Sequence, residues 1–415
     1  MKFTRVFAFM ALAGLAGSAY ATNGYFSHGY GMKAKGMAGA STAMHDDAFG
    51  GANNPAAMAF AGNRIDLGMD LFSPIREATN VGGSAAAQSG QSDSDYFLVP
   101  EFGYNRMVNS NLALGVTVYG NGGMNTDYPA VGGGNLLGGA GSLGVDLMQL
   151  IVAPTAAYKV NATHSIGISP LLGYQRFKAE GLSGFNSYSS SSANLTNNGY
   201  DDAFGYGVRI GYMGKITPTI TIGAAYASKI NFEEFDMYKG LFAEQGDFDI
   251  PENYNLGVAW QATPALKVAL DYQRINYNDV AAVGNPVTNL LVLNNPLGSA
   301  NGPGFGWDNI DVWKLGVEYK YSQKLTLRAG YSQNDNPISG ADMGEAMFNI
   351  LAPAVNKQHA TLGFTYTLAT GNEVTMSYAH AFDNEVSGTR PGFGGGVDTI
   401  EMYQNSIGIQ YSWKM

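Results

Sequence analysis

The residues best suited to chemistry stand near the N-terminus, in "AMHDDAF", where His45 precedes Asp46 and Asp47. A base beside a carboxylate forms part of a nucleophilic site, but such a site also needs a serine or another nucleophile within reach. No partner nucleophile can be identified for His45, and none of the five histidines stands in a metal-binding motif. We therefore expect no enzyme activity, no catalytic residue, no metal and no cofactor.

Composition and charge restrict the class of protein further. The 415 residues include 56 glycines and 25 tyrosines, and only 13% are charged. Average glycine usage is about 7%, so this chain has nearly twice the ordinary share, and its surface suits lipid better than water. The formal net charge of −10 argues against nucleic-acid binding, which needs a clustered basic surface. With no cysteine, the fold depends on packing and hydrogen bonds alone.

The first 21 residues predict export. Lys2 and Arg5 form a basic start, an apolar run spans residues 6–17, and "SAYA" supplies a cleavage site that ends at Ala21. This pattern is typical of a secretory signal peptide. A membrane-spanning helix needs about 20 apolar residues, and no later segment offers an uninterrupted run of that kind.

After Phe60 the pattern changes to alternation. In "NSIGIQYSWKM", Ile407, Ile409, Tyr411 and Trp413 share one face, which is the period of a β-strand. The pattern predicts an even number of strands, fourteen, over residues 65–77, 96–107, 112–119, 147–160, 165–179, 203–216, 219–232, 253–261, 265–276, 310–321, 324–333, 359–368, 373–382 and 401–415.

The connections between these strands alternate between short and long. Six short turns, such as "VNSN" and "ATGN", alternate without a break with seven long segments. Outer-membrane barrels have this asymmetry, with short periplasmic turns and long outer loops, and both chain ends would then lie on the periplasmic side. The predicted fold class is therefore all-β, a 14-stranded antiparallel transmembrane β-barrel of the Gram-negative outer membrane. The alternative is a soluble, secreted β-rich protein.

The two faces of the strands support the barrel. In residues 203–212, Phe204, Tyr206 and Tyr212 stand at the ends of an apolar stripe, as in an aromatic girdle. The opposite face carries alanine, glycine and Arg209. One face would meet lipid and the other a polar interior, and a closed barrel leaves no unpaired backbone edge in the hydrocarbon.

The stretch before the first strand shows neither the helical nor the strand period of apolar residues, and it is rich in glycine and alanine. Eight strands already leave room only for side chains or one small ligand, so a lumen walled by fourteen needs a plug. Arg209 and Arg328 face inward by parity, and we expect them to pair with acids of this plug such as Asp46 and Asp47. The predicted parts are a signal peptide (1–21), a hatch inside the lumen (22–63) and the barrel (64–415).

Several segments resemble one known family. "GYGMKAKGMAGASTAMHDDAFGGANNPAAMAF" is similar to the start of the long-chain fatty acid transporter (FadL/TodX-type) family, and "YGNGGMNTDYP" and "AAYKVNATHSIGISPLLGYQRFKAEGL" also fit. The resemblance covers essentially the whole mature chain. It implies a passive outer-membrane channel for long-chain fatty acids or for aromatic or aliphatic hydrocarbons. Outer loops would capture the substrate, and an inward kink in the third strand would release it sideways into the membrane.

The resemblance also assigns a gate. The kink would lie at Gly120, Gly122 and Gly123, and the alternative is that these glycines merely begin an outer loop. Glycine weakens and bends a strand. Lateral release would spare an alkyl chain the transfer into water, which costs about 0.8 kcal/mol per methylene. The gate and hatch residues are predicted to include a neighbouring turn, formed by Asn54, Pro55 and Ala56.

Three outer segments contain apolar residues that water would not favour. Two interpretations stand side by side, a capture surface for a hydrophobic substrate and loop-to-loop packing that caps the barrel. The substrate-binding candidates from these segments are Leu147, Leu150, Leu291, Leu293, Met347 and Phe348.

Arg176 is a further substrate-binding candidate, because it matches a basic position where fatty-acid members of the family can meet a carboxylate. Strict alternation from Ile166 points it outward, whereas a bulge at Pro170 would change the register, so its direction stays open. Asp308 and Asp311 stand where a lysine is expected in a fatty-acid binder. This departure puts carboxylate recognition in doubt and leaves room for neutral hydrocarbons.

The expected partners are a hydrophobic small molecule, outer-membrane lipid and lipopolysaccharide, and the resemblance alone implies a monomer. An outer-membrane adhesin or receptor barrel with no transport role is the alternative function, and a hydrophilic porin is a third. The chain ends in Met415 instead of the usual terminal aromatic residue, and Trp413 on the same face is the candidate substitute.

Overall fold

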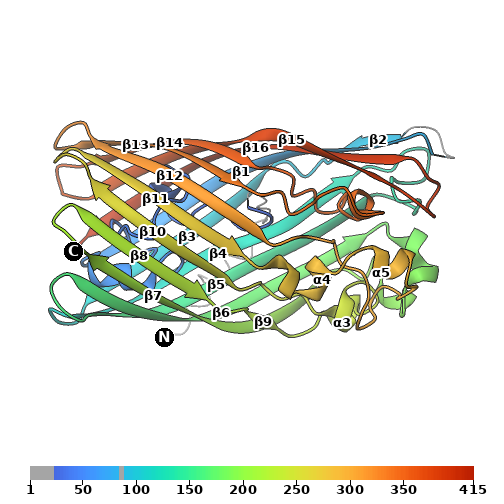
Figure 1. Cartoon of the computed structure of the whole chain (residues 1–415), viewed down its shortest axis with the longest axis horizontal. Coiled ribbons are helices and arrows are strands. Elements are labelled where there is room, and N and C mark those ends of the chain that lie inside the picture. The colour runs from blue at the N-terminus through green and yellow to red at the C-terminus, as the bar shows by residue number, and fades with distance from the viewer. Residues whose placement is uncertain (1–22, 84–87) are drawn as a thin grey trace.

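The computed structural model describes residues 23–83 and 88–415 and contains a closed barrel (Figure 1). Fourteen antiparallel strands form its wall, and the last strand pairs with the first from Arg64↔Lys414 to Val81↔Val397. This confirms the predicted 14-stranded antiparallel barrel, whereas the predicted signal peptide lies outside the described residues. The wall consists of β1 (Arg64–Val81), β3 (Phe97–Met107), β4 (Leu112–Tyr128), β5 (Leu143–Lys159), β6 (His164–Glu180), β7 (Asp201–Lys215), β8 (Ile220–Ala227), β10 (Asn253–Gln261), β11 (Leu266–Ile275), β12 (Ile310–Lys320), β13 (Leu325–Asn334), β14 (Gln358–Thr367), β15 (Glu373–Thr389) and β16 (Val397–Lys414).

The third strand of the wall is longer than the alternation predicts. β4 runs on to Tyr128 instead of ending at residue 119, so Gly120, Gly122 and Gly123 lie inside a strand. The alternative that these glycines merely begin an outer loop is therefore wrong. The glycines interrupt the alternation of side chains without ending the hydrogen bonds to β5.

Two short strands extend the sheet beyond its regular wall. β2 (Gln88–Gln91) pairs with the outer end of β1, and β9 (Asn231–Phe232) pairs with β7. The predicted strand 219–232 is thus divided, because the chain leaves the wall after Ala227 and returns to it beside Gly205 and Tyr206.

Apolar side chains alternate with polar or small ones along each strand. In β1, Leu67, Met69 and Leu71 point outward and are 44%, 49% and 38% exposed, whereas Asp66 and Asp70 are completely buried in the lumen. Exposed apolar rows of this kind form the lipid-facing surface of a membrane barrel. Among residues 23–83 and 88–415, no helix has both the length and the apolar character needed to cross a bilayer.

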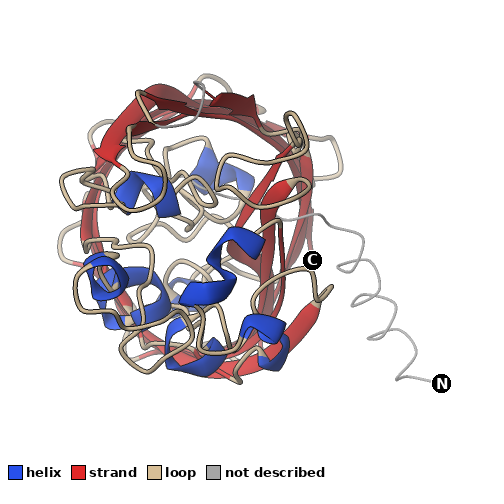
Figure 2. Ribbon diagram, turned by 90° about the vertical axis from the view of Figure 1, so that its right-hand side faces the viewer, coloured by secondary structure: helices blue, strands red, loops and turns tan. Residues whose placement is uncertain are grey.

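The two ends of the barrel differ. Short turns join the strands at the end where the C-terminus lies, and short helices gather toward the other end (Figure 1). Seen along the barrel, these helices and loops fill the opening (Figure 2). They are η2 (Ser183–Tyr188), η3 (Ser192–Asn194), η4 (Asp236–Tyr238), α3 (Ala243–Gly246), η5 (Tyr277–Asp279), α4 (Ala281–Gly284), α5 (Thr288–Leu291) and α6 (Glu345–Phe348).

Residues 23–63, called the N-terminal segment below, lie inside the ring of strands and contain α2 (Met32–Lys35) and η1 (Pro55–Ala59). Inward-facing glycines of the wall make room for them. A Cβ atom on Gly330 would come within 2.3 Å of the Met37 backbone, closer than real Cβ atoms approach other heavy atoms. The excess of glycine is thus explained in part by close packing between the wall and this segment.

Candidate functional site

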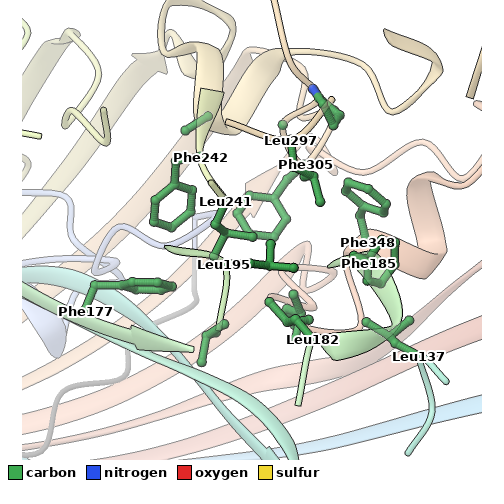
Figure 3. Close-up of a pocket in the computed structure, with 15 residues that line it drawn as sticks. Leu137, Phe177, Leu182, Phe185, Leu195, Leu241, Phe242, Leu297, Phe305 and Phe348 are labelled. Atoms are coloured by element: carbon green, nitrogen blue, oxygen red, sulfur yellow. The ribbon is translucent and has the colours of Figure 1, made fainter. Parts of the chain in front are cut away.

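The outer mouth of the barrel contains an entirely apolar pocket, called the outer pocket. Segments far apart in the sequence supply it, and their side chains point toward one another in Figure 3. The cavity encloses about 40 Å³, enough for a few water-sized groups, so a larger guest requires the loops to move apart. The lining residues are Leu137, Val145, Phe177, Leu182, Phe185, Leu195, Leu241, Phe242, Ala282, Leu297, Pro303, Gly304, Phe305, Phe348 and Leu351.

Aromatic contacts hold the outer pocket together. Phe177, on the inward face of β6, lies with its ring centroid 4.7 Å from that of Phe242 and 4.9 Å from that of Tyr238. Phe185 of η2 meets Phe348 of α6 edge-on at 5.7 Å. Aromatic pairs of this kind contribute about 0.5–1.5 kcal/mol each beyond burial. Because these contacts need no fixed polar geometry, they can form again around a guest.

The wall is interrupted between β3 and β4. Their hydrogen-bonded ladder runs only from Phe102↔Val118 to Met107↔Ala113, whereas the ladder between β4 and β5 continues to Tyr128↔Leu143. Over residues 97–101 and 119–126, all within the described chain, the two strands have no paired residues. At the outer end, the Asp93 amide donates to the Asp127 carbonyl at 2.8 Å. We call the unpaired stretch the ladder break.

A bulge shapes β4 at the ladder break. The register with β5 shifts between Gly120↔Leu150 and Gly122↔Gln149, so Asn121 is the extra residue. Its side chain turns into the barrel, where it is 2% exposed and donates to the Gln149 amide oxygen at 3.2 Å. Bulges bend a strand and leave one residue unpaired. The predicted kink glycines therefore coincide with a register shift in the third strand of the wall.

The start of the N-terminal segment covers the ladder break from inside. Phe26 forms an isolated β-bridge with Gly122, and the Ser27 amide donates to the Asn121 carbonyl at 3.2 Å. The Tyr25 carbonyl oxygen would lie 1.6 Å from a Cβ atom on Gly122. Only glycine at this position permits that approach. The bulge is therefore packed directly against the start of the N-terminal segment.

A second cavity, called the inner chamber, lies next to both features. It encloses about 20 Å³ between β1, β4 and two outer loops. Trp307 lines it and stands 6.2 Å from Phe305 of the outer pocket, measured between ring centroids. The Trp307 indole donates to the Asn349 amide oxygen at 2.6 Å. The lining residues are Tyr25, Phe72, Pro74, Arg76, Gly123, Met124, Asn125, Trp307, Ala352, Pro353, Ala354 and Met402.

A profile of the family described as "Outer membrane protein transport protein (OMPP1/FadL/TodX)" matches residues 11–405. The chain belongs to this family. Outer membrane protein P1 of Haemophilus influenzae is 23% identical over 388 residues, which cover 81% of each chain. The crystal structures of the Pseudomonas putida toluene transporter TodX and of a Pseudomonas aeruginosa FadL homologue match with TM-scores of 0.68 and 0.71, at 19% and 15% identity. Each match covers 94% of this chain and 99% of the other. The family and the barrel place the protein in the Gram-negative outer membrane and are those of transport channels.

Within this OMPP1/FadL/TodX barrel, the six predicted capture residues separate into two groups. Phe348 lines the outer pocket, Leu147 and Met347 are fully buried in the same apolar cluster, and Leu291 packs against that cluster. Leu150 is only partly buried, on the face of β5 that alternates with the buried Gln149 and Ile151, and Leu293 is 62% exposed. Most of the pocket was missed, because many of its residues are single apolar positions in loops without a period.

The predicted gate turn lies elsewhere. Asn54 accepts from the Ala56 amide at 3.1 Å as the cap of η1, and its side-chain nitrogen donates to the Tyr212 carbonyl of β7 at 3.0 Å. Pro55 lies against Gly167 of β6, where a Cβ atom would come within 2.4 Å of its backbone. The expectation that Asn54, Pro55 and Ala56 stand beside the kink is therefore wrong. Inward glycines of β6 and β7 receive the turn, and Phe26 lies beside the kink.

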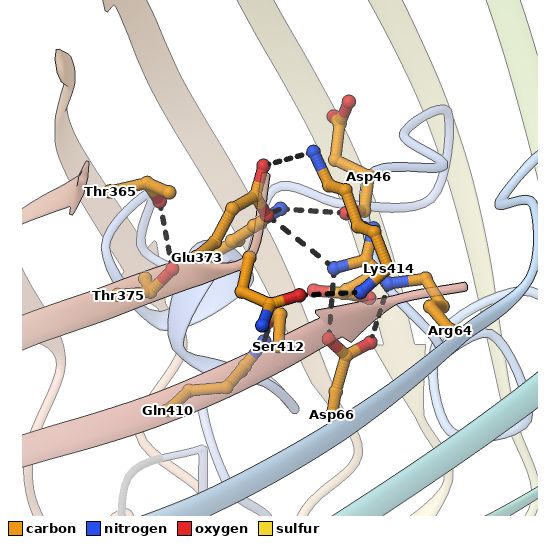
Figure 4. Close-up of polar contacts among 12 residues, drawn as sticks. Asp46, Arg64, Asp66, Thr365, Glu373, Thr375, Gln410, Ser412 and Lys414 are labelled. Carbon is orange, nitrogen blue, oxygen red and sulfur yellow. Dashed lines mark hydrogen bonds and ion pairs between the residues drawn. The ribbon is translucent and has the colours of Figure 1, made fainter. Parts of the chain in front are cut away.

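Buried polar contacts around Glu373 and Arg64 tie the N-terminal segment to the wall (Figure 4). Lys33 pairs with Glu373 at 2.7 Å. Lys35 pairs with both Asp70 and Glu101 at 2.8 Å. All these side chains are less than a tenth exposed, and a buried charge without a partner is strongly destabilising. The segment is thus held at particular positions by charge.

The two predicted cation–acid pairs do not form. Arg328 pairs with Glu318, its cross-strand partner, at 2.7 Å, and Arg209 donates to the backbone carbonyls of Gly51 and Ala52. Asp46 instead lies 3.5 Å from Lys267. The parity argument placed both arginines inward correctly, but the cross-strand register offered Arg328 a closer carboxylate than the N-terminal segment does.

Ionisation of Asp46 and Asp47 differs. Burial raises the pKa of Asp47 to about 6, and the charge of Asp66 adds to this effect. Burial also acts on Asp46, but Lys267 and other positive neighbours outweigh it and hold the pKa of that carboxyl far below its usual range. The two adjacent acids therefore differ in ionisation, because Asp47 keeps its proton up to about pH 6 whereas Asp46 stays charged.

Arg176 does not reach either cavity. It alternates with Gln175 and Phe177, which are buried inward, and its guanidinium lies over the Tyr200 ring at 4.4 Å. Pro170 causes no register shift between β6 and β7, so strict alternation holds and Arg176 is on the outward face. Asp308 is exposed and Asp311 pairs with Arg274 at 2.8 Å, and neither lines either cavity. Among the described residues, no three histidine, cysteine or acidic side chains are grouped to hold a metal ion.

Proposed function

We propose that this chain carries hydrophobic small molecules across the outer face of the outer membrane, taking them up in the outer pocket and releasing them sideways through the ladder break. The observation that carries this proposal is the combination of an apolar cavity under the outer loops with an unpaired stretch of wall strand, and the inner chamber is lined by residues next to both. The wall closes within one chain, without strands from a second copy, and we propose on the family resemblance a monomer surrounded by lipid and lipopolysaccharide.

Capture depends on the hydrophobic effect alone. Each methylene that leaves water for an apolar cavity gains about 0.8 kcal/mol, and no lining residue of the outer pocket carries a charge or a polar side chain. Hydrophobicity, and not one particular functional group, is therefore what the outer pocket selects. Relatives described as toluene transporters, from Pseudomonas putida and Ralstonia pickettii, support a hydrocarbon as one class of substrate.

Passage inward requires an aromatic partition to move. Tyr25, Tyr277 and Trp307 stand between the outer pocket and the ladder break, with ring centroids 5.1–5.8 Å apart. Burial raises the pKa of both tyrosine phenols, so they stay neutral. A neutral, aromatic partition gives a hydrophobic guest no charge to displace.

Release into the membrane suits such a guest. An alkyl chain that left into the periplasm would lose about 0.8 kcal/mol for each methylene exposed to water, whereas the hydrocarbon core of the membrane costs it almost nothing. A wall strand with free backbone groups is normally unfavourable in lipid. Here Phe26, Ser27 and Asn121 satisfy part of that edge from inside, so the N-terminal segment is the natural gate.

The test removes the bulge. Deletion of Asn121 restores the register of β4 with β5, and Asn121→Ala keeps the bulge while removing the same side chain. Cells that express each variant would be given a labelled long-chain fatty acid and a labelled alkylbenzene. We expect the deletion to reduce uptake to the level of cells without the protein and Asn121→Ala to transport. Equal uptake by both variants, with both barrels inserted, would rule out the lateral route, and no protein-dependent uptake at all would favour an adhesin or receptor.

A further inference from the structure

A hollow larger than either the outer pocket or the inner chamber lies on the outer surface of the barrel, where a short turn joins β3 to β4. It encloses about 550 Å³. The side chains that line it include Tyr104, Arg106, Val108, Leu114 and Val116. Asn105 and Ala113 alternate with these residues along the two strands and are completely buried on the lumen side. The hollow therefore faces away from the lumen, toward lipid.

The depth of this hollow in the membrane follows from the turn beside it. Residues 108–111 form the turn, all four are exposed, and the last three are polar. Short turns of an outer-membrane barrel lie on the periplasmic side. A strand rises about 3.4 Å per residue, so Arg106 stands roughly 7 Å from the turn. Tyr104 and Tyr158, on the outward faces of β3 and β5, are residues of the aromatic girdle expected at that interface. The hollow is therefore at the level of the inner-leaflet head groups.

The cation of the hollow, Arg106, has no side-chain partner among the residues that the structure describes. Its guanidinium donates no hydrogen bond and forms no ion pair with any of them. Cations on the outward face nearer the other end of the barrel do have partners. Lys178 pairs with Glu180 at 3.1 Å. Arg274 pairs with Asp311 at 2.8 Å. Arg106 therefore keeps all its donors free for a ligand.

The outward residues around Arg106 are apolar. Its cross-strand partner is Leu114, and Val116 follows on the same face of β4. On the other side of β3, the outward face of β1 begins with Ile65 and Leu67. A guanidinium binds phosphate through two parallel charge-assisted hydrogen bonds, and the apolar surface beside it suits a hydrocarbon chain. This combination is complementary to a molecule with an anionic head group and an acyl tail.

We propose that the hollow binds one anionic phospholipid of the inner leaflet, with its phosphate on Arg106 and an acyl chain along Leu114 and Val116. A zwitterionic phospholipid carries an ammonium group beside its own phosphate, so the guanidinium favours a lipid without one, such as phosphatidylglycerol. The site is on the lipid side of the wall and does not rest on the proposed transport function. The bound lipid would hold β3 and β4 together where they are paired, from Phe102↔Val118 to Met107↔Ala113.

The first experiment measures binding of dioleoylphosphatidylglycerol and of dioleoylglycerol, which has the same tails without the phosphate, to the purified protein in detergent. We expect wild-type protein to bind the phospholipid about tenfold more tightly, the effect of a hydrogen bond between charged groups. Arg106→Met should lose this preference, and Arg106→Lys should keep part of it. The matched control is Lys324→Met, which removes an exposed cation from another short turn, outside the hollow, and should keep the whole preference.

Equal binding of the two lipids by wild-type protein would refute the proposal. The same loss of preference in Arg106→Met and Lys324→Met would also overturn it, because the basic residues of this end would then attract anionic lipid without a site. If lipopolysaccharide bound with the same dependence on Arg106, the hollow would belong to a different lipid, and the assignment to a phospholipid would be wrong.

A second measurement needs no variant. A ligand that binds only the folded state stabilises it, so dioleoylphosphatidylglycerol should raise the thermal midpoint of wild-type protein more than dioleoylglycerol does at the same concentration. An equal rise with both lipids would contradict recognition of the phosphate.

Discussion

The inner and outer halves of the lumen are held together in opposite ways. Around the N-terminal segment, buried side chains meet in specific ion pairs such as Lys35 with Asp70 and Glu101. Around the outer pocket, the contacts are between apolar and aromatic side chains, and the lining contains no charged residue. An ion pair in a buried site tolerates little displacement, whereas apolar contacts can re-form at similar energy after a shift. The comparison indicates that the N-terminal segment is fixed in position, and that the outer pocket, which we propose as the capture site, can change shape.

The largest loss of stability is expected when a buried ion pair of the N-terminal segment is removed. Lys35→Met leaves Asp70 and Glu101 facing each other in the lumen at 0% and 2% exposure. Removal of one partner from a buried ionic cluster typically costs about 3–5 kcal/mol. We expect a large fall in the thermal midpoint of the purified barrel in detergent. We also expect a higher ion conductance through single inserted barrels, because the N-terminal segment would be held less firmly in the lumen.

Lys178→Met is the matched control, because Lys178 pairs with Glu180 where both side chains are solvent-exposed, at 31% and 47%. Exposed pairs contribute about 0.2–1 kcal/mol. If Lys35→Met and Lys178→Met changed the thermal midpoint equally, charge would not be what fixes the N-terminal segment.

Close packing against the wall is the second property that distinguishes the N-terminal segment from the outer pocket. In Gly330→Ala, the added Cβ would come within 2.3 Å of the Met37 backbone, and overpacking of this kind costs about 1–3 kcal/mol. In Gly68→Ala, also on the lumen side of the wall, the nearest atom is the end of the Met32 side chain at 3.5 Å. We expect thermal unfolding to distinguish the two variants, with only Gly330→Ala destabilised. Equal midpoints would mean that the N-terminal segment yields easily.

A charge introduced into the apolar outer pocket is expected to reduce uptake of a hydrophobic substrate. Leu195→Asp places a carboxylate at a completely buried position in the lining of the outer pocket, and a charge there repels a hydrophobic guest and draws in water. We expect uptake of an alkylbenzene to fall about tenfold, the equivalent of 1.4 kcal/mol. Leu293→Asp is the control, because Leu293 is 62% exposed and outside the lining. Similar uptake by the two variants would contradict capture in this pocket.

The fold could be predicted from the sequence far better than the site. Alternation and the lengths of the connections specify a barrel because both are local properties of the chain. The partner of Arg328 depends on its register with Glu318, and the ladder break depends on which residues of β3 lack a partner in β4. Neither property is local. Arg76 is an intermediate case, because parity along β1 places it inward with Asp66 and Asp70, but only the structure reveals that its guanidinium donates to two backbone carbonyls of the described residues.

The smallest expected effect concerns the neighbouring acids Asp46 and Asp47. Burial, followed by the charge of Asp66, raises the pKa of Asp47 from 3.8 to about 6 in the folded protein. The folded state therefore holds this proton more tightly than the unfolded state, and stability is lost as pH rises from about 4 to above 6. Asp47→Asn removes that loss, so its thermal midpoint should fall less than that of wild-type protein between about pH 5 and pH 7.5.

Asp46 supplies the reference of opposite sign. Burial acts on it too, but Lys267 and neighbouring cations hold its pKa far below the ordinary value, so its charge stabilises the folded state at neutral pH. Asp46→Asn should therefore lower the midpoint at about pH 7.5, while Asp47→Asn should raise it or leave it unchanged. If both substitutions shifted the midpoint in the same direction, only the net charge around the N-terminal segment would matter, and not the position of each acid. Opposite shifts would mean that the local surroundings of each acid decide its effect. That result is expected if specific ion pairs hold the inner half of the lumen together.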